Sequence, residues 1–233
     1  MRLLTGTSGF AYKEWKGSFY PADLPASGML RYYADHFDSV EINNTFYRMP
    51  SVRTLEQWAA DVPESFTFVL KASQTLTHRK RLRDVAEPAD YFFTTAGTLG
   101  SRLGPVLVQL PPNMKKDVDR LVDFLALVPP TQRAAFEFRH DSWFDDEVYD
   151  TLRARGASLC IAHADAQDTP FVATADWGYL RLRQVAYDDD ALRTWVQRVR
   201  GQDWSDAFVF FKHEDEGTGP RLAKRFVQLF RAE

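Results

Sequence analysis

The chain has 233 residues and a mass of 26.8 kDa, with 45% hydrophobic residues, 26% charged residues and a formal net charge of −3. These values are typical of a folded globular protein and exclude a disordered or fibrous chain. No linker or low-complexity stretch divides the sequence, and α/β barrels of this length form one unit. We therefore expect a single domain over residues 1–233.

The cysteine count and the N-terminal sequence indicate the cellular compartment. The lone Cys160 excludes a disulfide framework and a Cys-based zinc site. The N-terminus lacks the apolar core and cleavage site of a signal peptide, and no run approaches the roughly 18 apolar residues of a membrane span. A pI near 6.0 argues against a large nucleic-acid-binding face. We expect a cytoplasmic protein that does not bind membranes; nothing in the sequence specifies an oligomeric state.

Eight short runs rich in β-branched and aromatic residues recur along the chain and predict strands. They cover Leu3–Thr7, Ser39–Asn43, Phe66–Lys71, Val106–Leu110, Ala135–Arg139, Ser158–His163, Tyr179–Arg183 and Phe208–Lys212. Segments with helical spacing lie between them, at Met29–His36, Thr54–Val62, Ala89–Arg102, Asp117–Leu127, Asp145–Arg155, Asp189–Arg200 and Pro220–Arg231. The stretch from Ala164 to Asp176 is too polar and broken for a helix, so we expect an irregular sixth crossover there.

The repeat length indicates the architecture. Eight strands in 233 residues give about 29 residues per repeat, close to one βα unit of a (β/α)8 TIM barrel. An open doubly wound sheet is the rival, but its Gly-x-Gly-x-x-Gly fingerprint is absent after the first strand. The sequence therefore predicts an α/β protein with a single (β/α)8 TIM barrel.

The alternation of side chains along each strand predicts which residues enter the barrel. In the second strand Val40 and Ile42 share one face, and Glu41 and Asn43 share the other. In the sixth strand the pattern sets Cys160 and Ala162 toward the helices. Applied to all strands, it places these residues inside, near the C-terminal strand ends where barrel active sites lie: Glu41, Asn43, Lys71, Gln109, Glu137, Arg139, Ile161, His163, Tyr179, Arg181 and Arg183.

The charges in this set predict a ligand. Four cationic side chains face two carboxylates when His163 is neutral, so we expect a small anionic molecule such as a sugar phosphate or nucleotide-like compound, held by arginines. The alternative is a self-satisfied ionic network, with Glu41 paired to Lys71 and Glu137 to Arg139 or Arg181.

We predict Glu41, Lys71 and Glu137 as catalytic residues in a proton-transfer reaction of the isomerase type. Glu137 would be the base, Glu41 a second acid or base, and Lys71 would polarise a carbonyl or hold an anion. Two carboxylates on facing strands would also suit hydrolysis of a glycosidic or phosphoester bond.

Two further alternatives stay open. Glu41, Glu137, His163 and Asp165 could bind a divalent metal, but the surrounding Lys and Arg disfavour a second cation, so we predict no metal or other cofactor. A noncatalytic nucleotide- or nucleic-acid-binding protein would use aromatic stacking surfaces and Arg183 on a phosphate. Those surfaces would be Tyr47, Trp143 and Tyr179.

Loops after the strands add candidate substrate contacts. The segment Gly6–Phe10 offers small residues, hydroxyls and backbone N–H groups that a ligand could approach closely. The complete set of predicted substrate-binding residues is Thr7, Ser8, Asn43, Thr45, Tyr47, His78, Gln109, Arg139, His140, Trp143, His163, Tyr179, Arg181 and Arg183.

Several motifs together resemble a known family. They are Gly6-Thr7-Ser8-Gly9, Val40-Glu41-Ile42-Asn43-Asn44-Thr45-Phe46-Tyr47, Lys71-Ala72 with Thr77-His78, Gln109-Leu110-Pro111-Pro112, Glu137-Phe138-Arg139-His140 and Tyr179-Leu180-Arg181. This set resembles the YecE-like family of uncharacterised TIM-barrel proteins, domain-of-unknown-function 72, described as related to sugar isomerases. The resemblance implies the barrel and marks a site of Glu41, Asn43, Thr45, Lys71, His78, Gln109, Glu137, Arg139 and Tyr179.

The chain departs from the family pattern at two places. The family often has a His-Gly pair after the seventh strand, where this chain has Arg183-Gln184, and paired Asn near the eighth, where it has Lys212-His213. We expect substrate preference on that side of the barrel to differ.

Overall fold

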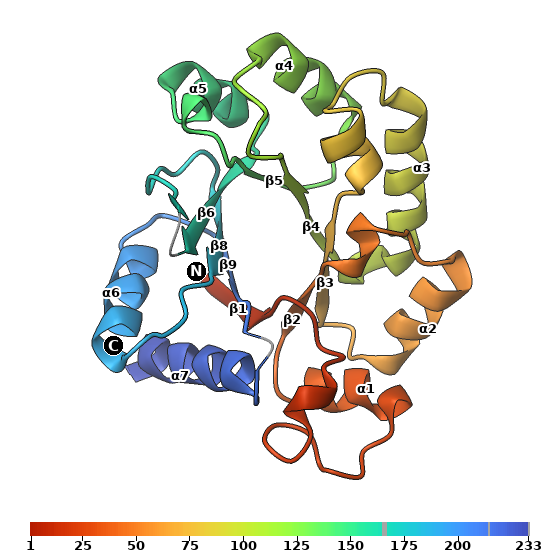
Figure 1. Cartoon of the computed structure of the whole chain (residues 1–233), viewed down its shortest axis with the longest axis vertical. Coiled ribbons are helices and arrows are strands. Elements are labelled where there is room, and N and C mark those ends of the chain that lie inside the picture. The colour runs from red at the N-terminus through yellow and green to blue at the C-terminus, as the bar shows by residue number, and fades with distance from the viewer. Residues whose placement is uncertain (165–166, 214, 233) are drawn as a thin grey trace.

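A computed structural model describes residues 1–164, 167–213 and 215–232 of the chain. Figure 1 shows a ring of strands surrounded by helices. The strands are β1 Arg2–Thr7, β2 Ser39–Ile42, β3 Thr67–Lys71, β4 Leu103–Gln109, β5 Ala134–Glu137, β6 Ser158–Ala164, β7 Gln167–Asp168, β8 Trp177–Leu182 and β9 Asp206–Phe211.

Eight of these strands pair in parallel, in the order β1-β9-β8-β6-β5-β4-β3-β2. A short parallel bridge between Ser8 and Glu41 brings β1 next to β2 and closes the ring. The Gly9 amide donates to the Glu41 carbonyl oxygen at 2.7 Å across this seam. Gly9 has a φ of 98°, and a Cβ there would meet the Tyr12 hydroxyl, so only glycine fits this turn. The predicted (β/α)8 barrel is confirmed.

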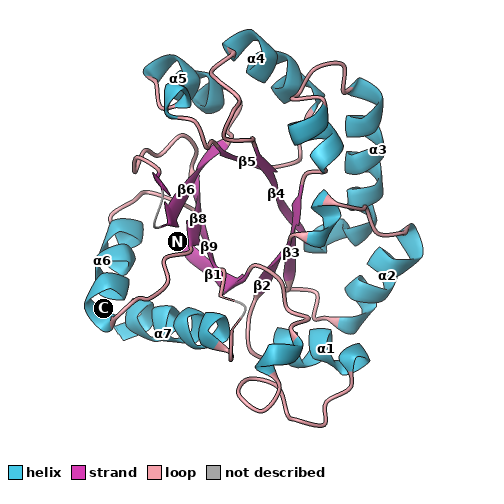
Figure 2. Cartoon of the chain, in the orientation of Figure 1, coloured by secondary structure: helices cyan, strands magenta, loops and turns pink. Residues whose placement is uncertain are grey.

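The helices form the outer layer, as Figure 2 shows. They are α1 Met29–Ala34, α2 Val52–Asp61, α3 Ala86–Ala96, α4 Val118–Leu127, α5 Asp146–Ala154, α6 Asp189–Arg200 and α7 Thr218–Ala232. Side-chain oxygens of Asp117, Asp145 and Asp188 cap α4, α5 and α6 by accepting backbone N–H groups. These caps explain why three predicted helix starts agree closely with the structure.

One predicted helix was too long. The helical spacing suggested a single helix over Ala89–Arg102, but α3 ends at Ala96 and a 3₁₀ turn follows over Gly97–Arg102. Gly100 adopts a φ of 58°, which a continuing α-helix does not allow. Gly100 therefore prevents the helix from continuing to Arg102 despite the apolar periodicity of the segment.

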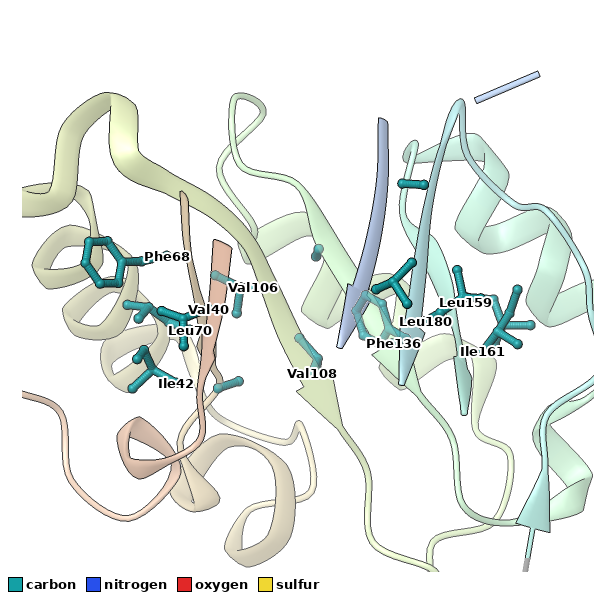
Figure 3. Close-up of a cluster of buried hydrophobic side chains, with 14 of the residues drawn as sticks. Val40, Ile42, Phe68, Leu70, Val106, Val108, Phe136, Leu159, Ile161 and Leu180 are labelled. Atoms are coloured by element: carbon teal, nitrogen blue, oxygen red, sulfur yellow. The ribbon is translucent and has the colours of Figure 1, made fainter. Parts of the chain in front are cut away.

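Alternation along the strands divides the apolar residues into two clusters. The outer cluster packs between strands and helices and includes Val40, Phe68, Val108 and Leu180 (Figure 3). The inner cluster fills the barrel itself with Leu4, Val69, Leu107, Ala135, Cys160, Trp177, Tyr179, Phe208 and Phe210. The barrel interior below the site is therefore a packed apolar core, and the predicted alternation is confirmed for the second, third, fourth, fifth and seventh parallel strands.

The sixth parallel strand, β6, reverses the predicted alternation. Cys160 belongs to the inner cluster, whereas Ile161 packs in the outer one. A cysteine is small enough for the crowded interior, while the larger isoleucine fills the space against the helices. The prediction that Ile161 and His163 point into the barrel was wrong, because Cys160, Ile161 and Ala162 are all apolar and the single polar residue His163 does not define a polar face.

The crossover that follows β6 is irregular, as predicted. It contains the two-residue strand β7, which pairs antiparallel with the end of β6, and no helix among its described residues 167–176. Over the described residues, no helix is both long and apolar enough to span a bilayer.

Candidate functional site

A layer of charged side chains lies at the C-terminal ends of the barrel strands, above the inner apolar cluster. Glu41 of β2, Glu137 of β5 and Arg181 of β8 are at most 2% exposed. Buried charges are costly unless paired, so their contacts decide whether this layer is stable.

Arg181 pairs with both buried carboxylates. Its Nη1 donates to Glu137 Oε2 at 2.5 Å, and its Nη2 donates to Glu41 Oε1 at 2.8 Å. Tyr179, two residues earlier on the same face of β8, donates its hydroxyl to Glu41 Oε2 at 2.6 Å. Asn43 Nδ2 donates to Glu41 Oε1 at 3.3 Å. The side chain that bridges the barrel is therefore Arg181, and the alternative pairing of Glu41 with Lys71 was wrong.

Glu137 gathers two more guanidinium groups. Arg139 Nε and Arg183 Nη2 donate to its Oε1 at 3.0 and 3.1 Å. The side chains of Arg139 and Arg183 are 30% and 17% exposed, so they lie at the rim of the mouth. Three cations thus surround one carboxylate, and Arg183 lies within the mouth rather than outside it.

The paired carboxylates stay ionised. Burial alone would raise the pKa of Glu137, but the guanidinium groups of Arg181, Arg183 and Arg139 hold that pKa well below its usual range. Burial also opposes ionisation of Glu41, whose pKa is lowered chiefly by Arg181. Burial raises the pKa of Tyr179 well above 10.0, so its hydroxyl remains a donor to Glu41.

Lys71 occupies a different environment on the other side of the mouth. Its Nζ donates to Gln109 Oε1 at 2.9 Å and lies 4.3 Å from the centre of the Phe46 ring. Among the described residues, no carboxylate lies within 4.0 Å of this nitrogen. Burial, with the nearby charge of Arg181, lowers the pKa of Lys71 to about 8. Lys71 is therefore an amine that is partly neutral near physiological pH.

His78 lies against the same aromatic ring. It belongs to the π-helical turn Thr75–Arg79 after β3, and its ring meets Phe46 edge-on with centroids 4.8 Å apart. The Thr77 hydroxyl bonds to its Nδ1 at 2.9 Å. Burial, with the charges of Lys71 and Arg139, lowers the pKa of His78, so the imidazole is neutral at pH 7. Phe46 thus contacts two nitrogen bases whose pKa values are lowered.

Phe46 lies in this site but was not among the site residues predicted from the sequence. It follows Thr45 in the 3₁₀ turn Asn44–Phe46, and Thr45 anchors that turn to β3: its Oγ1 donates to the Lys71 carbonyl oxygen at 2.7 Å and accepts from the Lys71 amide at 3.1 Å. Thr45 is fully buried, so it positions Lys71 and Phe46 rather than touching a ligand. The preceding Asn43-Asn44-Thr45 motif was the available signal.

Two predicted contacts lie away from the mouth. His163 packs on the helical side of β6, with its ring 5.0 Å from that of Trp195 and its Nδ1 2.9 Å from the Tyr187 hydroxyl. Trp143 is fully buried, stacks on Phe138 and donates its Nε1–H to the Met114 carbonyl. Both expectations of a residue at the mouth are therefore corrected, because His163 packs against Trp195 of α6 and Trp143 is taken up by its contacts with Phe138 and Met114.

Other predicted residues support the loops. Thr7 Oγ1 donates to the Gly9 carbonyl oxygen at 2.7 Å and pairs with the Tyr33 hydroxyl, so it shapes the first loop. His140 Nδ1 accepts the Ser142 amide and caps a 3₁₀ turn.

Tyr47 is 72% exposed, and Ser8 is buried beside the Ser8–Glu41 bridge. With Trp143 and Tyr179 both buried, the expected set of three stacking surfaces was wrong, and Tyr47 alone remains exposed.

The set of ligands considered for a divalent metal is not assembled. His163 lies on the helical side of β6, away from Glu41 and Glu137, and Asp165 lies outside the described residues. No group of three or more His, Cys, Asp or Glu side chains suited to a metal ion occurs in the described part of the chain.

Eight parallel strands, surrounding helices and a charged layer at the C-terminal strand ends define a (β/α)8-barrel protein of the kind that hosts active sites in this position. A family model described as "Protein of unknown function DUF72" matches residues 4–233, so the chain belongs to the DUF72 family. The family indicated by the sequence motifs is thereby confirmed.

Relatives and solved structures agree with this assignment. The chain is 29% identical to the UPF0759 protein YunF of Bacillus subtilis, covering 93% of this chain and 91% of YunF. It is 30% identical to the UPF0759 protein YecE of Escherichia coli over 49% of this chain and 43% of YecE. A DUF72 family structure from Thermotoga maritima superposes with a TM-score of 0.85 at 27% identity, covering 99% of this chain and all of the other. A DUF72 family structure from Enterococcus faecalis, at 18% identity and a TM-score of 0.82, shares the fold; 98% and 95% of the two chains are covered.

Proposed function

We propose that this protein is an enzyme that transfers a proton at a carbon next to a carbonyl group in a small anionic, sugar-like substrate. The reaction class is that of the sugar isomerases. The observation that carries the proposal is the surplus of cations at the barrel mouth, where three arginines and one lysine surround two carboxylates. An anionic substrate would balance this charge.

Arg139 and Arg183 are suited to bind the anionic group. Each uses one N–H on Glu137, and Arg183 Nε is buried without a hydrogen-bond partner among the described residues. A guanidinium carries five N–H donors in a planar fork, which matches a phosphate or carboxylate. Partial exposure at the rim leaves both side chains accessible to a ligand that enters from solvent.

Lys71 and His78 are suited to the reacting end. Lys71 would act on the carbonyl group, which is one of the two roles considered for it from the sequence. His78, neutral and partly exposed, would accept the proton from the adjacent carbon. Phe46 lies against both side chains and gives each an apolar neighbour. Proton transfer between neighbouring carbons needs this combination of one electrophilic group and one base.

This proposal moves the role of base away from Glu137. A carboxylate held by three guanidinium groups is a weak base, and its low pKa also makes it a poor general acid. Glycosidic hydrolysis needs one protonated carboxyl group, so the same environment disfavours that alternative. We assign Glu41 and Glu137 the role of holding Arg181 and orienting the rim arginines.

Thermal unfolding with paired ligands tests the proposal. We expect phosphorylated sugars to stabilise the protein, by about 2.7 kcal/mol over the ligand-free protein at 100 times the dissociation constant, and their uncharged counterparts at the same concentration to stabilise it less. Arg139→Gln should lose that difference. Arg133→Gln is the matched control, because Arg133 is a partly exposed, ion-paired arginine at the opposite end of β5. Equal stabilisation by charged and uncharged sugars, or an unchanged shift in Arg139→Gln, would contradict the proposal.

Exchange of a substrate hydrogen with solvent gives a second test of the proposal. Any phosphorylated hydroxyaldehyde or hydroxyketone that stabilises the protein should exchange the hydrogen next to its carbonyl group with deuterium in D₂O, followed by NMR. His78→Gln should bind the compound but exchange it more slowly, by the 10²- to 10⁴-fold that a general base typically contributes. Exchange at the wild-type rate in this variant would remove His78 from the mechanism.

A further inference from the structure

We infer that Lys71 is a nucleophile that forms an imine with the carbonyl carbon of the substrate, which would make anionic aldehydes and ketones the substrate class. The inference deepens the proposed function and rests on its assignment of Lys71 to the carbonyl end. It concerns a covalent bond, which acid/base proton transfer alone does not require.

The contacts of Lys71 leave its nitrogen available. Lys71 is 9% exposed, and among the described residues its Nζ donates a hydrogen bond to the neutral amide of Gln109. Arg181 occupies both buried carboxylates of the mouth, so neither forms an ion pair with this amine. A lysine that is desolvated, near other cations and without an anionic partner is the type that forms Schiff bases in enzymes.

Lys224 provides an internal comparison. Its Nζ lies 5.0 Å from the centre of the Phe19 ring, and burial lowers its pKa from the ordinary value. Lys224 is on α7, outside the barrel, and lines a cavity of about 640 Å³ between α6, α7 and the first loop. The two lysines share an aromatic contact and partial burial, but Lys71 alone of the two is at the charged mouth.

The proposed step is balanced without an oxidant or reductant. The lone pair of neutral Lys71 Nζ attacks the carbonyl carbon, the π electrons of the C=O bond move to oxygen, and one amine proton passes to that oxygen. The resulting carbinolamine takes a proton from solvent on its hydroxyl group, which leaves as water, and the nitrogen lone pair forms a C=N bond whose nitrogen keeps its remaining hydrogen, a protonated imine. Gln109 Oε1 accepts one N–H of the amine and would orient the nitrogen lone pair away from itself.

The imine would serve the proton transfer that we propose. A protonated C=N bond attracts electrons more strongly than a carbonyl group, so it acidifies the neighbouring C–H bond. His78, in contact with the same Phe46 ring, would accept that proton. Neutral amine is also more plentiful here than in an ordinary lysine, because a pKa of about 8 in place of 10.5 gives roughly 300 times more neutral lysine at pH 7.

Reductive trapping tests the inference on the intact protein. The probes are dihydroxyacetone phosphate, pyruvate and glycolaldehyde, each with sodium cyanoborohydride at pH 7. An imine reduced by hydride leaves a stable secondary amine, with a mass gain of the probe minus one oxygen atom. We expect one adduct, located at Lys71 by proteolysis and tandem mass spectrometry. Lys71→Met should lose it, whereas Lys224→Met should keep it.

The pH dependence adds an independent readout. The trapping rate at Lys71 should rise with an apparent pKa near 8, whereas surface lysines should react only as the pH approaches 10.5. Peptide mapping of the wild-type protein gives this answer even if Lys71→Met fails to fold. Adducts spread over exposed lysines, or none at Lys71 with any of the three probes, would overturn the inference.

The probes also distinguish failure of the inference from failure of the proposed function. Glycolaldehyde carries no charge, so its adduct at Lys71 needs no anion site. Stabilisation by dihydroxyacetone phosphate that depends on Arg139, without an adduct from any probe, would overturn the imine and leave the proposed function standing. An adduct from glycolaldehyde with no effect of phosphate would support the imine and overturn the anionic substrate.

Discussion

The barrel mouth has two halves with opposite electrostatic character. We call the first the ion-paired half: Glu41, Glu137, Tyr179 and Arg181. We call the second the amine half: Phe46, Lys71 and His78. In the first, each charge meets a buried partner within 3.0 Å. In the second, two nitrogen bases contact an aromatic ring and lack a carboxylate among the described residues.

This difference separates stability from reactivity. Paired, fully buried charges have pKa values shifted away from neutral pH, so they do not exchange protons under ordinary conditions. Lys71 and His78 are shifted toward neutral forms and can exchange protons or attack a carbon. We expect substitutions in the ion-paired half to change folding first, and substitutions in the amine half to change chemistry first.

Arg181→Met should produce the largest effect, because it leaves two buried carboxylates without their bridging cation. We expect a loss of about 3–5 kcal/mol in the free energy of unfolding, measured by urea denaturation. Arg183→Met is the control, since it removes a partly exposed arginine that shares Glu137 with two others. Equal losses in the two variants would contradict the bridging role of Arg181.

Acid should weaken the ion-paired half as a unit. Both carboxyl groups have folded pKa values below the unfolded value of 4.5, so their stabilisation is complete above pH 4.5 and is lost as the pH falls below it. Below pH 4.5, and while the group stays ionised in the folded state, each carboxyl group lowers the free energy of unfolding by about 1.4 kcal/mol for every unit that the pH falls. Urea midpoints between pH 5 and 3.5 measure this loss, and a steep slope that persists in Glu41→Gln/Glu137→Gln would refute it.

Tyr179→Phe should have a smaller effect in the same half. It removes one short hydrogen bond to an ionised carboxylate, with an expected loss of about 1.5–3 kcal/mol in the free energy of unfolding. Tyr47→Phe, at an exposed ring, is the control and should change stability by less than about 0.5 kcal/mol. A Tyr179→Phe variant as stable as wild type would show that water replaces the hydroxyl.

Lys71→Met should change stability least and in an unusual direction. The folded pKa of about 8 lies below the unfolded value of 10.5, so burial of the ammonium destabilises the protein below pH 8, and stability rises between pH 8 and 10.5. We expect the variant to be at least as stable as wild type at pH 7, and to lack a gain of about 1–2 kcal/mol between pH 8 and 9.5. Parallel curves for the two proteins would contradict the pKa assignment.

The sequence by itself determined the barrel and most of the charged layer. Alternating apolar and polar residues in strands such as β2 and β5 have a clear polar face, and the helices meet only the apolar one. Glu41, Glu137, Tyr179 and Arg181 follow directly from that alternation. Aspartate caps likewise specify the starts of α4, α5 and α6 through local hydrogen bonds.

Only the tertiary structure decided how these residues pair and which of them face solvent. Alternation indicates a face but no distance, so it could not show that Arg181, and not Lys71, binds Glu41. It also fails where a strand lacks a polar face, which is why His163 was placed on the wrong side of β6. The reactive environment of Lys71 arises because the two carboxylates are already paired with Arg181, a relation between strands far apart in the chain.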